Sequence, residues 1–171
     1  MLAYLEGEVK AKGANFVILA TSCGMGYLVY VPPRLTSRRK LSLFVYQYQT
    51  EKSSALFGFS SFRERELFAS LIKIPGLGPK GALGLVSLYR PKELLHFIEQ
   101  GDIAKLEAAP GIGKKTARKL LAEFSSEVFF KETDEKVIEA LQSLGFSRRE
   151  AQDSLRYLTG KEKSLEQKIR R

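Results

Sequence analysis

The sequence has few of the residues that build metal centres and redox sites. Its 171 residues include one cysteine, one histidine and no tryptophan. Cys23 cannot form an internal disulfide, and with His96 as the only other soft ligand the chain has no set of zinc ligands. Zinc fingers and CxxC redox sites are therefore excluded, and we expect no metal site and no cofactor.

Long apolar runs are also missing. No segment approaches the roughly 20 apolar residues that cross a bilayer. The segment Met1–Glu6 reaches an acidic residue before the basic start of a secretion signal could form. We therefore expect a soluble, cytoplasmic protein with no membrane partner.

Acidic side chains are outnumbered by 28 Lys and Arg to 19 Asp and Glu, which gives a formal charge of +9. This excess makes a polyanion the first partner to consider. Residues 1–62 and 63–126 each carry a net charge of +4, whereas residues 127–171 carry only +1. We expect the polyanion-binding surface in the first two segments and a protein partner or a structural role for the third.

The first 60 or so residues predict a small β-barrel. Five segments rich in β-branched and aromatic residues alternate with Gly, Asn and Pro turn signals. They are Ala3–Lys10, Phe16–Leu19, Tyr27–Val31, Leu41–Tyr48 and Ser54–Phe59. About five short strands suit an OB-fold, and a nonspecific β-sandwich is the alternative.

Helical periodicity replaces the strand pattern from Ser61 onward, and short helices interrupted by Gly and Pro continue to about Phe124. A polar stretch that ends near residue 133 predicts a tether, and a last helical group follows. Within this group Ser147–Glu150 has the spacing of a capping box. We expect a barrel at 1–62, a helical domain at 63–126, a short tether at 127–133 and a small helical module at 134–171.

An internal repeat is the most informative feature. The segment Pro75–Ala82 recurs 35 residues later as Pro110–Ala117, with Pro, Gly, aliphatic, Gly, Lys and Ala in register. Each copy lies between two helical segments. A helix, a Gly-aliphatic-Gly turn and a second helix form a helix-hairpin-helix motif, and this chain has two.

The chemistry of that turn suits a phosphate. Glycines allow positive φ and remove the Cβ atoms that would block the backbone N–H groups. The second helix then directs its free N–H groups and its positive dipole end at the same anion. Such a site contacts phosphates and not bases, so we expect nucleic-acid binding without sequence preference. The candidate phosphate-binding residues of the two turns are Gly76, Leu77, Gly78, Lys80, Gly111, Ile112, Gly113, Lys114 and Lys115.

A nucleotide-binding P-loop is the competing interpretation of the second copy. The motif needs Gly where Ala108 stands and Ser or Thr where Lys115 stands. We therefore reject ATP binding by this chain.

The order of these motifs closely resembles that of the RuvA family, the DNA-binding subunits of the bacterial Holliday junction branch migration complex. The resemblance covers the whole chain. It rests on Gly24–Val29, Leu56–Phe59, Glu66–Phe68, Leu71–Lys73, Gly76–Lys80, Pro110–Ala117 and Leu144–Ala151. It implies an α+β multidomain protein: a five-stranded OB-fold barrel, a domain with two helix-hairpin-helix motifs and a three-helix, UBA-like module.

The resemblance also implies partners and a mode of action. A homotetramer would hold four-way junction DNA open during recombination and repair, and whether a tetramer or an octamer acts on DNA stays open. The terminal module, with Leu155 and Leu158 as candidate contacts, would recruit the RuvB ATPase, and the RuvC resolvase is a further expected partner. The resemblance places the DNA phosphate contacts at Lys80, Lys114, Lys115 and Lys119. The family also places an acidic pin in the turn between the last two barrel strands. Here Glu51 matches the pin, and Lys52 stands where a second acid is often found.

Two other classes of function remain open on the residues alone. A helix-hairpin-helix glycosylase or nuclease would need an acid cluster near the second hairpin, where the acids are scattered: Glu123, Glu127, Glu132 and Asp134. OB-folds and paired hairpins also serve RNA-binding proteins. We expect no catalytic residue and a DNA scaffold.

Overall fold

The computed structural model of the protein describes residues 2–51, 53–124, 126–143 and 145–151. The chain divides into two compact units, Met1–Ser126 and Glu127–Arg171. In the described part of the chain, no helix is both long and apolar enough to pass through a membrane.

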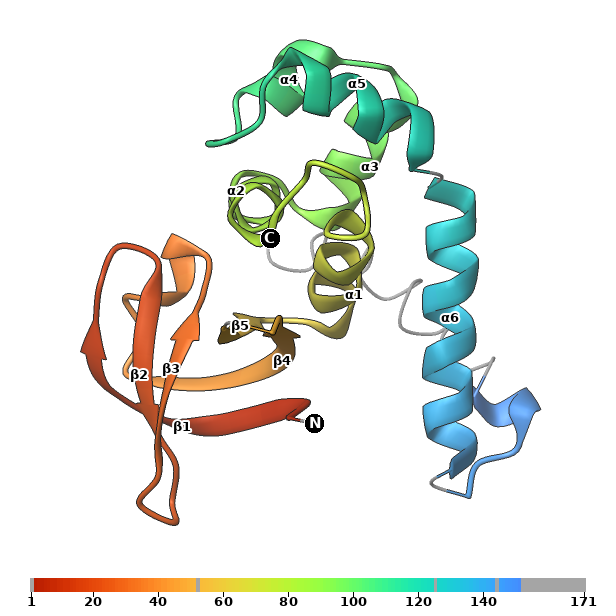
Figure 1. Ribbon diagram of the computed structural model, residues 1–171. Coiled ribbons are helices and arrows are strands. Elements are labelled where there is room, and N and C mark those ends of the chain that lie inside the picture. Colours follow the sequence, from red (N-terminus) through yellow and green to blue (C-terminus); the bar gives the residue numbers. More distant parts are fainter. Residues whose placement is uncertain (1, 52, 125, 144, 152–171) are drawn as a thin grey trace, which may run out of the picture. The chain divides into compact units, whose positions relative to one another are not determined.

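The first unit begins with a closed barrel in the strand order β1-β2-β3-β5-β4 (Figure 1). Its strands are β1 (Tyr4–Lys12), β2 (Phe16–Ala20), β3 (Gly26–Tyr30), β4 (Lys40–Gln49) and β5 (Ser54–Phe59). Neighbours pair antiparallel, except that β3 and β5 run parallel. The closed five-stranded barrel confirms the predicted OB-fold barrel.

Strand alternation fills the barrel with aliphatic side chains. Leu41, Leu43 and Val45 on β4 all point inward and are at most 4% exposed, whereas Ser42 between them is exposed. A period of two residues places alternate side chains on opposite faces of a strand. The remaining residues of this core cluster come from β1, β2, β3 and the segment that follows β3: Leu5, Val17, Leu19, Val29, Val31 and Leu35.

Five helices complete the first unit (Figure 1). They are α1 (Phe62–Leu71), α2 (Pro79–Leu88), α3 (Pro91–Glu99), α4 (Ile103–Glu107) and α5 (Lys114–Glu123). The strand pattern ends where Ser61 caps α1, because its hydroxyl accepts the Glu64 N–H at 3.2 Å. The helices from residue 62 to residue 123 confirm the predicted helical domain.

An ionic contact joins the barrel to the helices. Arg34, on the 3₁₀ turn η1 (Pro33–Leu35), donates to the carboxylate of Glu64 on α1 at 2.8 Å. The same guanidinium donates to the backbone oxygens of Val86 and Ser87 on α2 at 3.0 and 3.2 Å. Next to this contact, Phe68 of α1 is fully buried and lies 4.8 Å from the ring centre of Phe57 on β5. The helical hairpins are therefore held in one position relative to the barrel.

The second unit begins with α6 (Ser126–Ser143). Residues 127–133, where we expected a tether, are helical, which corrects that expectation. The polar residues of this stretch include good helix formers, and neither Gly nor Pro occurs between residues 126 and 143. A stretch of polar residues therefore does not by itself predict a loop in this chain.

A capping box follows α6. Gly145 takes φ +94°, and the Glu150 carboxylate accepts both the N–H and the hydroxyl of Ser147, at 2.8 and 2.7 Å. These hydrogen bonds lower the pKa of Glu150. The capping box confirms the helix start predicted from its spacing. Leu155, Leu158 and the helix expected from Ser164 lie outside the described residues.

Candidate nucleic-acid interface

The first hairpin, between α1 and α2, is a hydrogen-bonded turn. The N–H of Leu77 donates to the oxygen of Ile74 at 3.0 Å, with Pro75 and Gly76 as the two central residues. Gly76 has φ +87°. A turn with Pro first and a positive φ second is type II, which requires Gly at the second position. The Pro-Gly pair therefore determines the shape of this turn.

The second hairpin, between α4 and α5, has the same geometry. The N–H of Ile112 donates to the oxygen of Ala109 at 3.1 Å, and Gly111 has φ +84°. The aliphatic residues Leu77 and Ile112 are 3% and 6% exposed, so each anchors its turn in the apolar interior. The sequence repeat is therefore also a structural repeat, as the spacing predicted.

Each turn leads directly into an uncapped helix start. Gly78 and Gly113 are the N-cap residues of α2 and α5, and neither helix receives a side-chain capping bond. The first intrahelical bonds are donated only by Ala82 and Ala117. The N–H groups before them are left without an intrahelical acceptor, as at every helix start. Both hairpins therefore present free donors and the positive end of a helix dipole.

Open space surrounds these N-caps. Gly78 and Gly113 have φ −77° and −99°, which any residue can adopt. A Cβ placed on either would meet no atom within 4 Å. Neither the backbone nor the packing of the chain requires glycine there. What glycine provides is unobstructed access to the N–H groups, as a phosphate oxygen would need.

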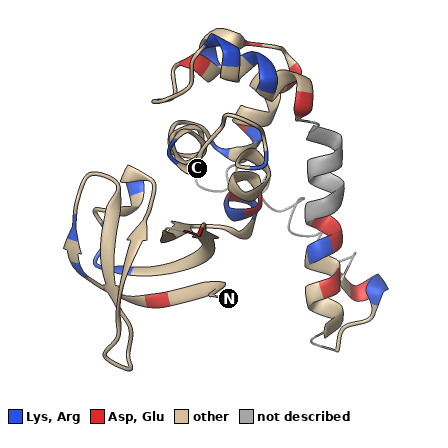
Figure 2. Ribbon diagram, in the orientation of Figure 1, with Lys and Arg blue, Asp and Glu red and all other residues tan. Residues whose placement is uncertain are grey.

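Lysines add full charges to both hairpins. Lys80, Lys114, Lys115 and Lys119 are all exposed, and no acidic side chain within the described residues forms an ion pair with them. Lys115 and Lys119 are four residues apart on α5, so they share a face of that helix. In Figure 2 stretches of the α5 ribbon are blue, the colour of Lys and Arg.

Arg118 is a further basic residue of this surface that the sequence reasoning missed. It is exposed and lies four residues after Lys114, on the same face of α5. The signal was available in the run Arg118-Lys119.

Close packing fixes the two hairpins side by side. A Cβ on Gly84 of α2 would lie 3.3 Å from the ring of Pro110 and 3.4 Å from its oxygen. A Cβ on Gly81 would lie 2.9 Å from Leu77 and 3.5 Å from Ile112. These small residues let α2 approach the second hairpin directly. The two hairpin turns are therefore held at a fixed separation.

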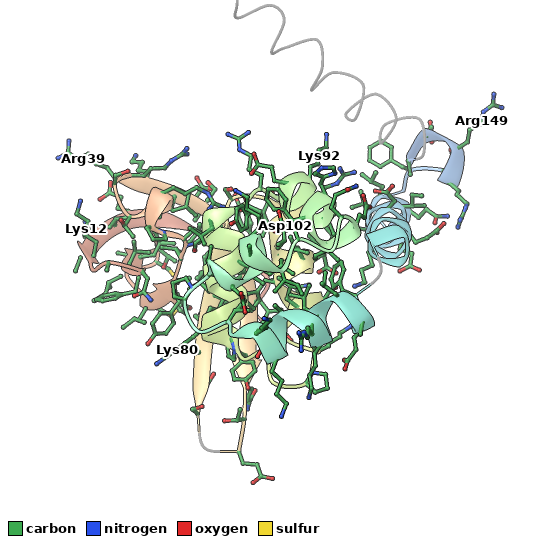
Figure 3. The ribbon with its side chains drawn as sticks, turned by 90° about the horizontal axis from the view of Figure 1, so that it is seen from above. Lys12, Arg39, Lys80, Lys92, Asp102 and Arg149 are labelled. Atoms are coloured by element: carbon green, nitrogen blue, oxygen red, sulfur yellow. The ribbon has the colours of Figure 1, made fainter. Side chains whose placement is uncertain are left out.

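The hairpin between β4 and β5 projects from the barrel (Figure 3). Thr50 closes its turn by donating its N–H to the oxygen of Ser53 at 2.8 Å. Glu51 is exposed in this turn, and Lys52 lies outside the described residues. The structure thus places the expected pin carboxylate on a protruding, solvent-facing turn.

No three His, Cys, Asp or Glu side chains gather as metal ligands within the described residues. Glu123 is one of the acidic residues near the second hairpin that a nuclease or glycosylase would need in a cluster. Its side chain is exposed at the end of α5.

Comparison with known proteins matches both halves of the first unit. Residues 1–58 match the model of the RuvA N terminal domain, and residues 68–126 match that of a SAM-like helix-hairpin-helix tandem. The second match covers both hairpins described above.

Curated relatives match along most of their length. The chain is 34% identical to the Holliday junction branch migration complex subunit RuvA of Exiguobacterium sibiricum, over all of this chain and 95% of that protein. The proteins of the same name from Chloroflexus aggregans and Geobacillus sp. are 34% and 29% identical. These matches cover 88% and 100% of this chain and 85% and 96% of the relatives. With its closed barrel, its tandem hairpins and these relatives, the chain belongs to the RuvA family.

Proposed function

We propose that this chain binds four-way junction DNA without sequence preference and serves as the non-catalytic scaffold of a branch migration complex. The observation that carries the proposal is the pair of matching hairpins, held side by side by the contact of Gly84 with Pro110. Each hairpin presents free N–H groups, a helix start and lysines. The names of the curated relatives support the same substrate.

The two hairpins act on the DNA backbone. A phosphate oxygen accepts hydrogen bonds from the N–H groups that follow Gly78 or Gly113, while Lys80 or Lys114 and Lys115 neutralise its charge. All of these donors contact the phosphate, which is the same in every nucleotide. Binding is therefore independent of base sequence and strongly dependent on salt.

The symmetry of the substrate favours a symmetric assembly. A four-way junction has four equivalent arms, so a homotetramer offers each arm the same set of sites. Two hairpins per chain then hold phosphates on both sides of every arm, and an octamer would enclose the junction between two such faces. Oligomer size is read directly from a native mass spectrum of the protein with and without junction DNA.

The turn with Glu51 gives the assembly its preference for an open junction. Four copies of this carboxylate near the centre of a basic face repel a continuous duplex, and diverging arms avoid them. Lys52 offsets part of that repulsion. The pin therefore acts by discouraging the wrong substrate.

The second unit recruits the ATPase that drives branch migration. Residues 127–171 are nearly neutral, and Phe146, which is 49% exposed, adds an apolar surface for a protein partner. We assign RuvB ATPase recruitment to this unit, with Leu155 and Leu158 as candidate contacts, and RuvC as a partner at the same junction. Hydrolysis of ATP belongs to RuvB, and work on chromosomal DNA places the complex in the cytoplasm.

Competition binding tests the DNA function. A labelled four-way junction is displaced by an unlabelled junction, by linear duplexes of two unrelated sequences and by structured RNA. We expect the junction to compete best and the two duplexes to compete equally. A preference for one duplex sequence, stronger competition by RNA, or scission of the DNA in Mg²⁺ would overturn the proposal.

Truncation tests the division of labour. A chain that ends after Ser126, the boundary of the first unit, should bind junctions like the full chain and fail to support ATP-driven migration with RuvB. The full chain is the control. Migration by the truncated chain, or loss of its junction binding, would contradict the assignment.

A further inference from the structure

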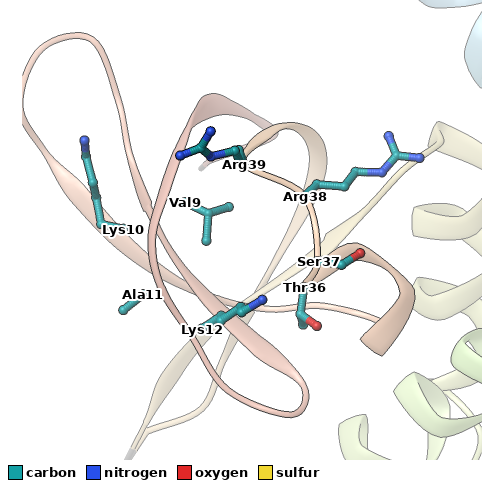
Figure 4. A pocket seen from close by; sticks show the side chains of 8 residues that line it. All are labelled: Val9, Lys10, Ala11, Lys12, Thr36, Ser37, Arg38 and Arg39. Carbon is teal, nitrogen blue, oxygen red and sulfur yellow. The ribbon is translucent and has the colours of Figure 1, made fainter.

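Basic side chains surround a hollow on the barrel that the hairpins do not use (Figure 4). The hollow has a volume of about 200 Å³ and is lined by residues 9–12, at the end of β1, and residues 36–39, between η1 and β4. Lys40 lines a second hollow that shares Lys10 and Arg39 with the first. We call this set the rim cluster, and its members are Lys10, Lys12, Arg38, Arg39 and Lys40.

Strand pairing brings the two segments of the rim cluster together. Glu8 of β1 lies opposite Lys40 of β4, and the N–H of Val9 donates to the oxygen of Arg39 at 2.8 Å. The pairing of β1 with β2 shifts register between Val9 and Ala11. An irregularity of this kind bends a strand and redirects its side chains. Cations that are nearly 30 residues apart in sequence therefore meet at one rim.

Little negative charge balances the rim cluster. Glu8 is the one carboxylate in its two hollows, and it bonds to Lys10 at 3.0 Å. Lys10, and then Lys40 and Arg39, lower the pKa of Glu8. Lys12, Arg38 and Arg39 are exposed, and none of them forms an ion pair with an acid in the described part of the chain.

This composition suits a phosphate. Unpaired like charges at one rim repel one another, and an external anion relieves that repulsion. Two arginines offer planar forks that match phosphate oxygens, and the exposed hydroxyl of Ser37 lies in the same wall. The hollow is shallow and open, which fits a backbone passing across it better than an enclosed small molecule.

The rim cluster lies away from the first hairpin. Figure 3 shows Lys12 and Arg39 at one end of the barrel and Lys80 elsewhere on the same unit. A folded unit of this length is about 35–40 Å across. A duplex arm of about 8 base pairs, at about 3.4 Å per base pair, is shorter than that width. An arm of about 25 base pairs extends well beyond it.

We propose that the rim cluster is a second DNA contact, which binds the phosphodiester backbone of a junction arm beyond the reach of the hairpins. The inference rests on the proposed function, because it takes the arm of a bound junction as its ligand. An acidic protein segment is the competing occupant. The fork geometry of Arg38 and Arg39 favours the nucleic acid, as does a lining of the hollow that is polar or basic apart from Val9 and Ala11.

A triple variant with a matched control tests the proposal. The rim variant carries Lys12→Gln, Arg38→Gln and Arg39→Gln. The control carries Arg90→Gln, Lys105→Gln and Arg149→Gln, which are also exposed, remove the same charge and lie outside the two hairpin turns and the rim cluster. Exposed substitutions of this kind leave folding intact. The parent and both variants are titrated with junctions whose arms have about 8 or about 25 base pairs, over a range of salt.

We expect the rim variant to bind the long-armed junction about tenfold or more weakly than the control, and to differ less from the control on the short-armed junction. Its log–log salt slope on long arms should be shallower by about 0.9 for each phosphate contact removed. Equal affinities of the two variants on long arms would overturn the inference. A rim variant that loses affinity for polyglutamate alone would also overturn the inference, because that result would identify an acidic protein partner.

The design separates this inference from the proposed function. A parent protein that fails to prefer junctions over duplex refutes the junction function. The same three proteins are therefore also titrated with a linear duplex of about 25 base pairs. If only the rim variant loses affinity for this duplex, the rim cluster contacts the DNA backbone even where the junction function is refuted.

Discussion

Replacing Gly113 by Ala separates binding from folding at the second hairpin. Gly113 has φ −99° and ψ 172°, and an added Cβ would meet nothing within 4 Å. Alanine restricts the unfolded chain, which stabilises by about 0.4–1 kcal/mol, but it is a poorer N-cap by a similar amount. We therefore expect the free energy of unfolding of Gly113→Ala to stay within about 0.5 kcal/mol of the parent.

The effect on DNA should be much larger. The methyl group would occupy the space through which a phosphate oxygen reaches the N–H groups of α5. A hydrogen bond to a charged group contributes about 1.5–3 kcal/mol. Loss of one such bond weakens junction binding about 10- to 150-fold, since about 1.4 kcal/mol is tenfold.

Two other glycines serve as controls. Gly111 in the same hairpin and Gly24 in the turn between β2 and β3 both have φ +84°, and a Cβ added to either would meet no atom within 4 Å. Alanine at either should cost about 1–2 kcal/mol of stability, because positive φ strains an L side chain. Gly24→Ala should nevertheless bind junctions like the parent, whereas Gly111→Ala should lose both stability and affinity.

Urea denaturation measures the free energies of unfolding, and fluorescence anisotropy with a labelled junction at fixed salt measures the affinities. A Gly113→Ala variant that binds like the parent would refute the reasoning, because no phosphate would then approach this helix start. A Gly113→Ala variant that unfolds as readily as Gly111→Ala would refute the claim that the glycine is not required for folding.

The hairpin lysines, the pin and the barrel contact each give a further prediction. Lys114→Ala with Lys115→Ala should weaken junction binding by about 1 kcal/mol or more per contact and reduce the salt slope, with urea stability unchanged as the check on folding. Glu51→Gln should tighten binding to linear duplex and lower the junction-to-duplex affinity ratio, because it removes a charge that repels phosphates. An unchanged ratio in competition binding would show that Glu51 is not an acidic pin. Arg34→Met should lower the free energy of unfolding by about 1–3 kcal/mol in urea, because it leaves the Glu64 carboxylate with its Ser60 hydrogen bonds and without its cationic partner. A loss below about 0.5 kcal/mol would show that this contact does not hold the barrel to the helices.

The candidate DNA site was largely predictable because its determinants are local. Pro75 and Gly76 specify a type II turn within four residues, and Ser61 caps α1 through a residue three positions later. The repeat of the same residue types at Pro110–Ala117 then predicted a second copy of the same geometry. Short-range interactions of this kind leave a residue-type signature that needs no knowledge of the fold.

The tether was predicted wrongly because polarity does not determine backbone conformation. Residues 127–133 carry charged side chains and Thr, which suggested a loop, yet they continue as α6. Polar residues such as Glu and Lys form helices readily, and a helix start or stop is signalled by caps, Gly or Pro. The sequence contains no such stop until Gly145.

By itself the sequence determined the change from strands to helices near residue 61, the two Gly-aliphatic-Gly turns and the basic character of the first 126 residues. The tertiary structure alone decided which distant residues meet. Gly84 approaches Pro110, Arg34 reaches Glu64, and Arg39 joins Val9 at the rim of the barrel. Contacts between residues far apart in the chain depend on which strands pair and on how the helices pack, and short-range residue patterns do not specify either. The separation of the two hairpins and the rim cluster therefore arise only once the barrel closes and the helices pack.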